Sequence, residues 1–185
     1  MPINLSGEGH SLEEEFFRKE NERLMESLRE MKALEQTKGM LSEVSGISDP
    51  KLLDQLAQLR VTPASAAALV ILPLIEVAWA DGTVDAAERL AILDSLDHVL
   101  FFQTVDRDIV EAWLTEAPSQ ELFATWETYA RHLIDQLDPE QKRALASSIL
   151  GHAEKVAKAA GAFLGLGGIS KAEQAVIDRV GKALR

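Results

Sequence analysis

The stretch VAWADGTVDAAE, residues 77–88, decides the fold, because it ends one apolar helix, turns at a glycine and begins another helix. Gly82 can adopt the left-handed backbone conformation in which many helices end. Asp85 and Glu88 have the spacing of a capping box, in which each side chain accepts a hydrogen bond from the other residue's backbone N–H. The stretch therefore predicts a helix-turn-helix whose turn is an acidic loop, residues 81–88.

The sequence on both sides of this turn also has the spacing of helices. Residues 64–80 are apolar on nearly every side, which indicates a central buried helix, and Pro73 should kink it. The other expected helices of the domain share apolar residues at helical spacing and lie at residues 50–59, 85–100, 107–115, 119–137, 139–162 and from 171 onward.

Composition supports a fold made of helices alone. Of the 185 residues, 46% are hydrophobic but only 5% are aromatic, so leucine, alanine, valine and isoleucine must fill the core. These residue types suit packed helices better than sheets, and no stretch alternates as a strand does. We therefore predict an all-α, multi-helix bundle.

The chain is strongly acidic and has no cysteine. Thirty acidic residues against nineteen basic ones give a net charge of -11, which repels the phosphates of nucleic acids and of anionic lipids. No nucleic-acid partner is expected. The lack of cysteine excludes disulfides, thiolate catalysis and cysteine-ligated zinc.

The N-terminal sequence MPINLSGEGHSLEEEFF has neither the basic start nor the apolar run of a signal peptide. The most apolar stretch, residues 64–80, is shorter than the roughly 20 residues that span a bilayer. No integral membrane segment is expected, and a cytoplasmic location follows as the default expectation.

The N-terminal region divides into a tail and an arm. Residues 1–10 are rich in glycine and polar residues and are predicted to be disordered, whereas Ser11 and Glu14 form a capping box that opens a helical arm, residues 11–46. Gly39 and Gly46 interrupt the arm's pattern. The remaining residues, 47–185, form the main helical domain.

The arm is amphipathic, and two uses of its apolar stripe stay open. The stripe either docks on the main domain or pairs with another chain as a short coiled coil, because the pattern covers too few turns to decide. Phe16, Phe17 and Leu24 are the candidate interaction residues for a protein partner or for self-association. The stripe consists of Leu12, Phe16, Phe17, Leu24, Leu28 and Met31.

Residues 77–88 have a loose echo at residues 156–173. Both stretches end a helix, turn at glycine, insert one β-branched residue and restart with a capping box, which in the second case joins Ser170 to Glu173. The simplest account is a pair of related helix-turn-helix halves packed around a shared core.

The acidic loop allows two interpretations. Its spacing from Asp81 to Glu88 matches the second half of a calcium-binding EF-hand loop, but Val77 and Trp79 offer no oxygen where the first half would need ligands. A complete EF-hand is therefore excluded. In the first interpretation the loop only ends one helix and caps the next.

Asp81 is the residue that capping leaves unexplained, since a carboxylate at a helix C-terminus faces the unfavourable end of the helix dipole. In the second interpretation Asp81 and Glu88 bind a divalent cation, with Asp85 assisting. The candidate ions are Ca²⁺, Mg²⁺, Mn²⁺ and Zn²⁺.

An apolar helix ending in Ala-Asp-Gly, followed by a β-branched residue and Asp-x-x-Glu, resembles the TerB-like domain, a family named for a tellurite-resistance protein. The resemblance covers about residues 63–185. It implies an all-helical domain of two similar halves, with acidic residues at the turns that are associated with divalent metals. The second half departs from the pattern, because the glycine-rich residues 164–168 replace Asp-Gly and leave Glu173 as the only acid retained.

No nucleophile, acid–base pair or cofactor-binding loop stands out, so the expected function is not enzymatic. Trp79, one helical step from the acidic loop, is a candidate contact residue. We expect a helical interaction or adaptor module linked to stress response, with the cation site at residues 81–88. The alternative is a structural or oligomerising protein whose arm self-associates and whose acidic loop only caps helices.

Overall fold

The computed structural model describes residues 5–98, 104–163 and 168–185, and within these ranges the chain is helical with no strand. The all-α prediction is confirmed. The helices are α1 (Leu5–Ser45), α2 (Pro50–Gln58), α3 (Pro63–Ala66), the 3₁₀ helix η1 (Ala67–Ile71), α4 (Leu72–Ala78), α5 (Ala86–His98), α6 (Arg107–Thr115), α7 (Gln120–Asp135), α8 (Pro139–Phe163) and α9 (Lys171–Ala183).

Helix α1 is longer than the sequence predicted. It begins at Leu5 rather than at Ser11, and it continues through Gly39 to Ser45, where Gly46 ends it with a φ of 70°. Once a helix has nucleated, each added residue gains a hydrogen bond, and one exposed glycine costs only about 1 kcal/mol. The predicted start at Ser11 and break at Gly39 are therefore wrong. Of the predicted tail, residues 1–4 lie outside the described ranges.

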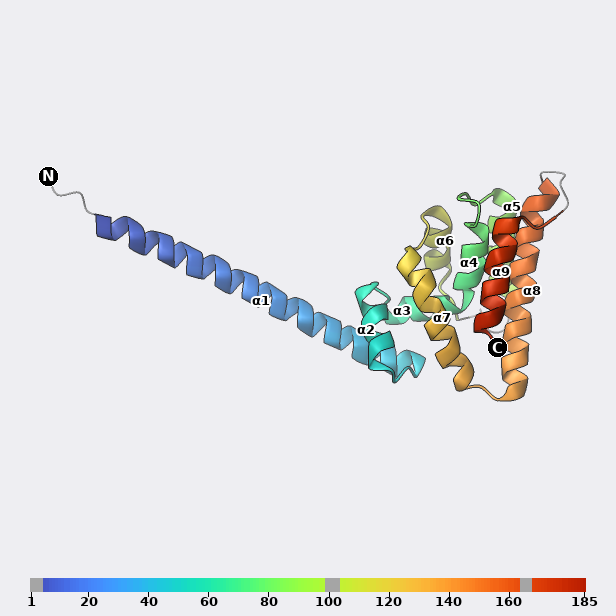
Figure 1. The fold of residues 1–185 in the computed structure, drawn as a ribbon, viewed down its shortest axis with the longest axis horizontal. Helices are drawn as coiled ribbons and strands as arrows, with labels where there is room; N and C mark the ends of the chain where they lie inside the picture. The colour runs from blue at the N-terminus through green and yellow to red at the C-terminus, as the bar shows by residue number, and fades with distance from the viewer. Residues whose placement is uncertain (1–4, 99–103, 164–167) are drawn as a thin grey trace.

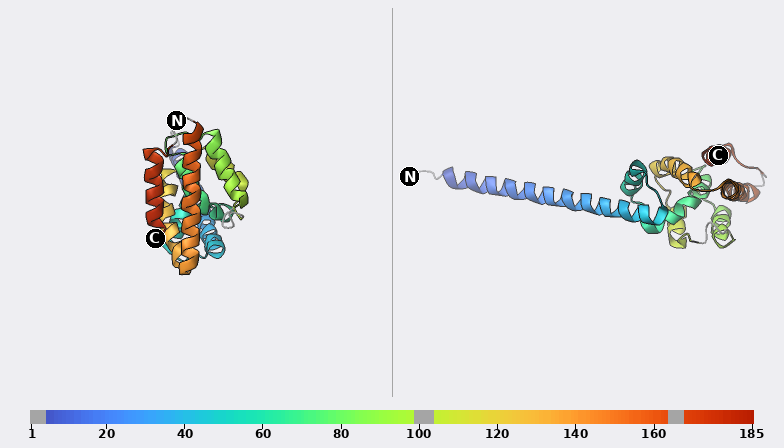
Figure 2. Two further views of the ribbon diagram at one scale, coloured as in Figure 1. Left: turned by 90° about the vertical axis from the view of Figure 1, so that its right-hand side faces the viewer. Right: turned by 90° about the horizontal axis from the view of Figure 1, so that it is seen from below.

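Only the C-terminal end of α1 packs against the domain. Figures 1 and 2 show α1 leaving the domain as one straight helix, with its base beside α2 and α3. Leu41, at this base, is fully buried, whereas every residue from 14 to 33 is exposed. We call residues 14–33 the free arm.

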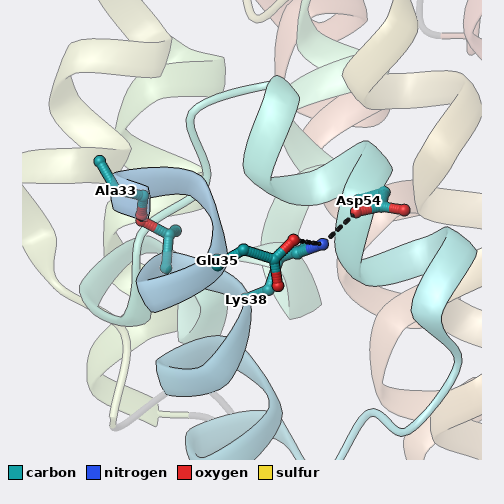
Figure 3. Close-up of polar contacts among 5 residues, drawn as sticks. Ala33, Glu35, Lys38 and Asp54 are labelled. Carbon is teal, nitrogen blue, oxygen red and sulfur yellow. Dashed lines mark hydrogen bonds and ion pairs between the residues drawn. The ribbon is translucent and has the colours of Figure 1, made fainter. Parts of the chain in front are cut away.

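An ion pair fixes the base of α1 to α2. Lys38 Nζ lies 2.7 Å from Asp54 Oδ1 in α2 and 2.5 Å from Glu35 Oε1 in its own helix (Figure 3). The hydrogen bond to Asp54 and then that to Glu35 raise the pKa of Lys38, and the cost of its burial is smaller. The ammonium therefore stays charged between two carboxylates and holds the direction in which α1 leaves the domain.

The apolar segment from Pro63 to Ala78 forms the centre of the domain, as predicted. It starts with a capping box between Thr62 and Ser65 and is interrupted by η1 just before Pro73. A proline lacks the N–H that would donate to the carbonyl four residues earlier, here that of Leu69. That carbonyl instead accepts from the backbone N–H of Leu72 and from the indole N–H of Trp126.

Helix α4 contacts α5, α6, α7, α8 and α9, and all of its residues except Glu76 are buried. Glu76 pairs with Arg179 of α9, which also lies 3.5 Å from Glu127 of α7. Burial of one central helix on all sides by its neighbours is the arrangement expected of a helix that is apolar all round.

None of the described helices is both long enough and apolar enough to cross a membrane alone. The segments Pro50–Gln58 and Pro63–Ala78 meet those requirements only when taken together, and they join at a bend of 109°.

Candidate functional site

The acidic turn between α4 and α5 is built by backbone capping. Gly82 has a φ of 94°, which an L side chain rarely adopts. The Asp85 N–H donates to Glu88 Oε2 over 2.9 Å, and the Glu88 N–H donates to Asp85 Oδ1 over 2.8 Å. These two bonds form the predicted capping box at the start of α5.

Asp81 also has a structural role, which the sequence interpretation did not find. Its Oδ1 accepts from the Thr83 backbone N–H over 3.0 Å and from the Thr83 hydroxyl over 3.2 Å. Such a turn, closed by an aspartate side chain two residues before the donor, is common in loops. Helix α4 ends at Ala78, so Asp81 lies beyond its last turn and the expected conflict with the helix dipole is absent.

Glu88 is the chemically unusual residue of the turn. It is only 4% exposed, and burial raises the pKa of its carboxyl from the ordinary 4.5 to about 7. The hydrogen bond from Asp85 opposes this shift, while the negative charges of Asp85, Asp81 and Glu173 add to it. Glu88 therefore keeps its proton to a higher pH than an ordinary glutamate does.

Glu173 belongs to the same buried site, although it comes from a different helix. It is 6% exposed and accepts from the Ser170 N–H over 2.6 Å, while its own N–H donates to the Ser170 hydroxyl over 3.2 Å. The capping box predicted for α9 is thus confirmed. The repeated motif was the sequence signal for this residue, but its closeness to Glu88 depends on how α4, α8 and α9 pack.

The predicted cation ligands do not form a metal-binding group. Among the described residues, no set of three or more histidine, aspartate and glutamate side chains lies in an arrangement that could hold a metal ion. Asp81, Asp85 and Glu88 each use one carboxylate oxygen to accept from a backbone N–H. These residues do not fit a cation held by three protein ligands.

Trp79 is tied to the domain rather than presented to solvent. Its ring is partly buried against the core, and its indole N–H donates to the Trp113 carbonyl of α6 over 2.9 Å. This bond gives Trp79 a structural role at the end of α4. Its predicted role in contacting a partner stays a prediction.

The free arm carries the largest exposed apolar side chains of the described residues. Phe16 and Phe17 are each 64% exposed, and their rings meet edge to face with centroids 6.0 Å apart. Leu24 is 53% exposed. Docking of these three side chains on their own domain, one of the two predicted alternatives, is wrong. The other alternative, contact with another chain, stays open.

Three further apolar side chains of the free arm are equally accessible, although the sequence did not single them out as interaction residues. Met25 is 52%, Leu28 48% and Met31 61% exposed. Helical spacing named two of them as part of the stripe, but the same spacing describes a buried stripe equally well. Their exposure follows from the way α1 leaves the domain, where Leu41 and Lys38 hold its base.

The chain was compared with protein-family models, with curated proteins and with solved structures, and none of the three comparisons gives a match.

Proposed function

We propose that the protein is a non-enzymatic interaction module, in which a helical domain presents the free arm to a protein partner. One observation carries this proposal: large apolar side chains recur at helical spacing on the free arm, where every residue is exposed. Rows of this kind on other proteins insert into a groove or pair with another helix.

The energetics of the free arm support the same proposal. Most helical stability in proteins comes from packing of an apolar face rather than from the helix propensity of the residues. Side chains that are half to two-thirds exposed, such as Phe17 and Leu28, contribute little of that packing until a partner covers them. Binding therefore stabilises the arm and buries its apolar stripe in one step.

A photo-crosslinking amino acid at position 24 of the full chain tests this function in living cells. The matched control places the same group at position 26, which lies about 160° away around the helix. We expect protein adducts from position 24, few from position 26, and loss of the adducts when Leu28→Glu is added. Equal or absent adducts at both positions would overturn the interaction function.

The resemblance to TerB-like domains and the arrangement in two halves belong to the same proposal. In each of the pairs α4–α5 and α8–α9 the second helix begins with a capping box whose glutamate is buried, and α4 packs on α8 and α9 while α5 packs on α8. An exchange of the two pairs would preserve these contacts. The link to stress response and the cytoplasmic setting stay predictions.

A divalent cation at the acidic turn is the second part of the proposal, and one observation favours it: Glu88 and Glu173 are buried close enough to repel each other. Water would have to supply the other ligands of the cation. A proton on Glu88 is the alternative, because it relieves the same repulsion without a metal. Titration with Ca²⁺, Mg²⁺, Mn²⁺ and Zn²⁺, followed by amide NMR, distinguishes the cation from the proton. If resonances of residues 81–88 and 170–173 do not move at millimolar metal, the cation role fails.

A further inference from the structure

Resting on the proposed interaction function, we propose that the partner of the free arm is a second copy of this chain, paired in parallel and in register. The contact is a line of five residues along one side of the arm, which we call the seam. The seam consists of Phe17, Asn21, Leu24, Leu28 and Met31.

The spacing of the seam is that of a two-stranded coiled coil. Its residues follow one another at steps of four, three, four and three, which keeps them on one narrow stripe of a helix. All five are exposed, and the four apolar ones expose 48 to 64% of their surface. Phe16 lies about 100° away from this stripe, so it borders the seam through its ring contact with Phe17.

Charge is placed where such a pair requires it. The ion pair of Lys19 with Glu15, at 2.8 Å, lies about 160° around the helix from Phe17, and Arg18, which borders the seam at about 100°, is turned outward by its ion pair with Glu22, at 2.9 Å. These side chains stay in water when two arms pair. The seam itself contains no charged residue, so its burial leaves no ion unpaired.

Asn21 decides the orientation of the two arms. In a parallel pair in register every seam residue faces its own copy, so the Asn21 amides donate to and accept from each other. In the antiparallel registers that align the seams, Asn21 faces Leu24 or Met31 of the second copy. A buried amide without a partner is costly, which favours the parallel pair.

The domains leave room for this arrangement. The base of α1 packs on its own domain through the face that carries Leu34 and Leu41, which lies about 100° or more around the helix from Phe17. A two-fold axis along the arms therefore places the two domains on opposite sides of the helix pair. Figures 1 and 2 show that none of the other described helices lies beside the free arm.

The seam is short, which sets the strength of the pair. Glu14 and Glu35 occupy the next positions of the pattern at its two ends, and like charges facing each other end the contact. The 15 residues between Phe17 and Met31 span about 22 Å of helix. Such a contact buries less than the roughly 800 Å² per partner of a standard interface, so the dimer should dissociate on dilution.

Disulfide trapping tests orientation cleanly, because the chain has no cysteine of its own. Glu14→Cys and Met31→Cys are made singly in the full chain, with Glu26→Cys on the opposite face as the matched control. In the parallel pair, each of the first two variants forms a disulfide with itself, and an equal mixture gives few mixed dimers. A mixture dominated by the 14-to-31 disulfide overturns the parallel arrangement, and so do yields no higher than the control.

Sedimentation equilibrium provides an independent readout that does not depend on cysteine. The mass of the wild-type chain should rise toward twice the chain mass with concentration, and Leu24→Glu with Leu28→Glu should hold it at one chain mass without changing the unfolding temperature of the domain. Asn21→Leu should tighten association at least tenfold and admit larger assemblies. If the wild-type chain stays monomeric while position 24 crosslinks to other proteins, this inference fails and the interaction function stands.

Discussion

The indole N–H of Trp126 donates to the carbonyl of Leu69 over 2.9 Å. In a regular helix this carbonyl would accept from the backbone N–H of residue 73, which is a proline and has none. Both residues are buried, so neither polar group has water as an alternative partner. The bond joins α7 to the centre of the domain. It also gives the Leu69 carbonyl a donor where the 3₁₀ helix η1 interrupts the helical hydrogen bonds before α4. A proline in a buried helix thus depends on a tryptophan far away in the sequence.

Trp126→Phe should lower the free energy of unfolding by about 1 to 3 kcal/mol, because it leaves the Leu69 carbonyl with one donor fewer in a buried place. Chemical denaturation measures the loss. In a Pro73→Ala background the backbone N–H at position 73 can donate to Leu69, so the same substitution should cost less. An equal cost in both backgrounds would contradict this account of the bond.

Glu88→Gln should stabilise the domain above pH 7 by about 1 to 2 kcal/mol, since one pKa unit corresponds to about 1.4 kcal/mol and solvent screening reduces the full shift. Glutamine still accepts from the Asp85 N–H, so the capping box survives. Because burial raises the pKa of Glu88 to about 7, only the folded state holds the proton between pH 4.5 and 7. The free energy of unfolding should therefore fall as pH rises through that window.

The variant should lose this slope, and unfolding measured from pH 4 to pH 8 shows whether it does. Glu26→Gln on the free arm is the control for loss of one negative charge. A wild-type chain whose stability rises between pH 5 and pH 7, and loses that rise in Glu88→Gln, would show that Glu88 is favoured in its ionised form.

Arg60→Gly should stabilise the domain by about 0.5 to 1 kcal/mol. Arg60 has a φ of 59° at the end of α2, where the Val61 N–H donates to the Leu56 carbonyl and the Arg60 N–H to that of Ala57. This pattern favours glycine. The left-handed backbone conformation costs energy for any residue with a Cβ, and the exposed arginine makes no contact that compensates for this cost. Arg60→Ala should give no such gain, because alanine keeps the Cβ. Thermal unfolding of both variants checks the difference.

Asp54→Asn should loosen the base of α1 without unfolding the domain. It removes one of the two carboxylates around Lys38 and keeps the shape of the side chain. Amide hydrogen exchange should become faster for residues 34–45 and stay unchanged in α8. Glu15→Gln, which breaks an ion pair on the free arm, should leave exchange at the base unchanged. Equal protection of residues 34–45 in both variants would contradict the anchoring role.

Local signals in the sequence predicted the local structure well. Pro50 after Asp49, the box at Asp85 and Glu88, and the box at Ser170 and Glu173 each begin a helix where expected. Each depends on residues at most a few positions apart. The end of the helix predicted to reach residue 100 and the glycines at 165 and 167 lie outside the described residues.

The features that could not be predicted from the sequence depend on packing between residues far apart in the chain. Gly39 weakens a helix, but the burial of Leu41 against α2 and α3 keeps that helix intact. The charge of Glu173 acts on Glu88 only because the helices that carry them pack on the same neighbours, α4 and α8. The apolar stripe of the arm has the same spacing whether it is buried or free, so its exposure could not be read from the pattern.

Helix α1 runs unbroken from Leu5 to Ser45, and the part beyond the ion pair at Lys38 is a lever about 50 Å long. A rotation of about 10° at Lys38 displaces its far end by about 9 Å. Two domains joined through such levers can change their separation by a large distance while each keeps its own core unchanged.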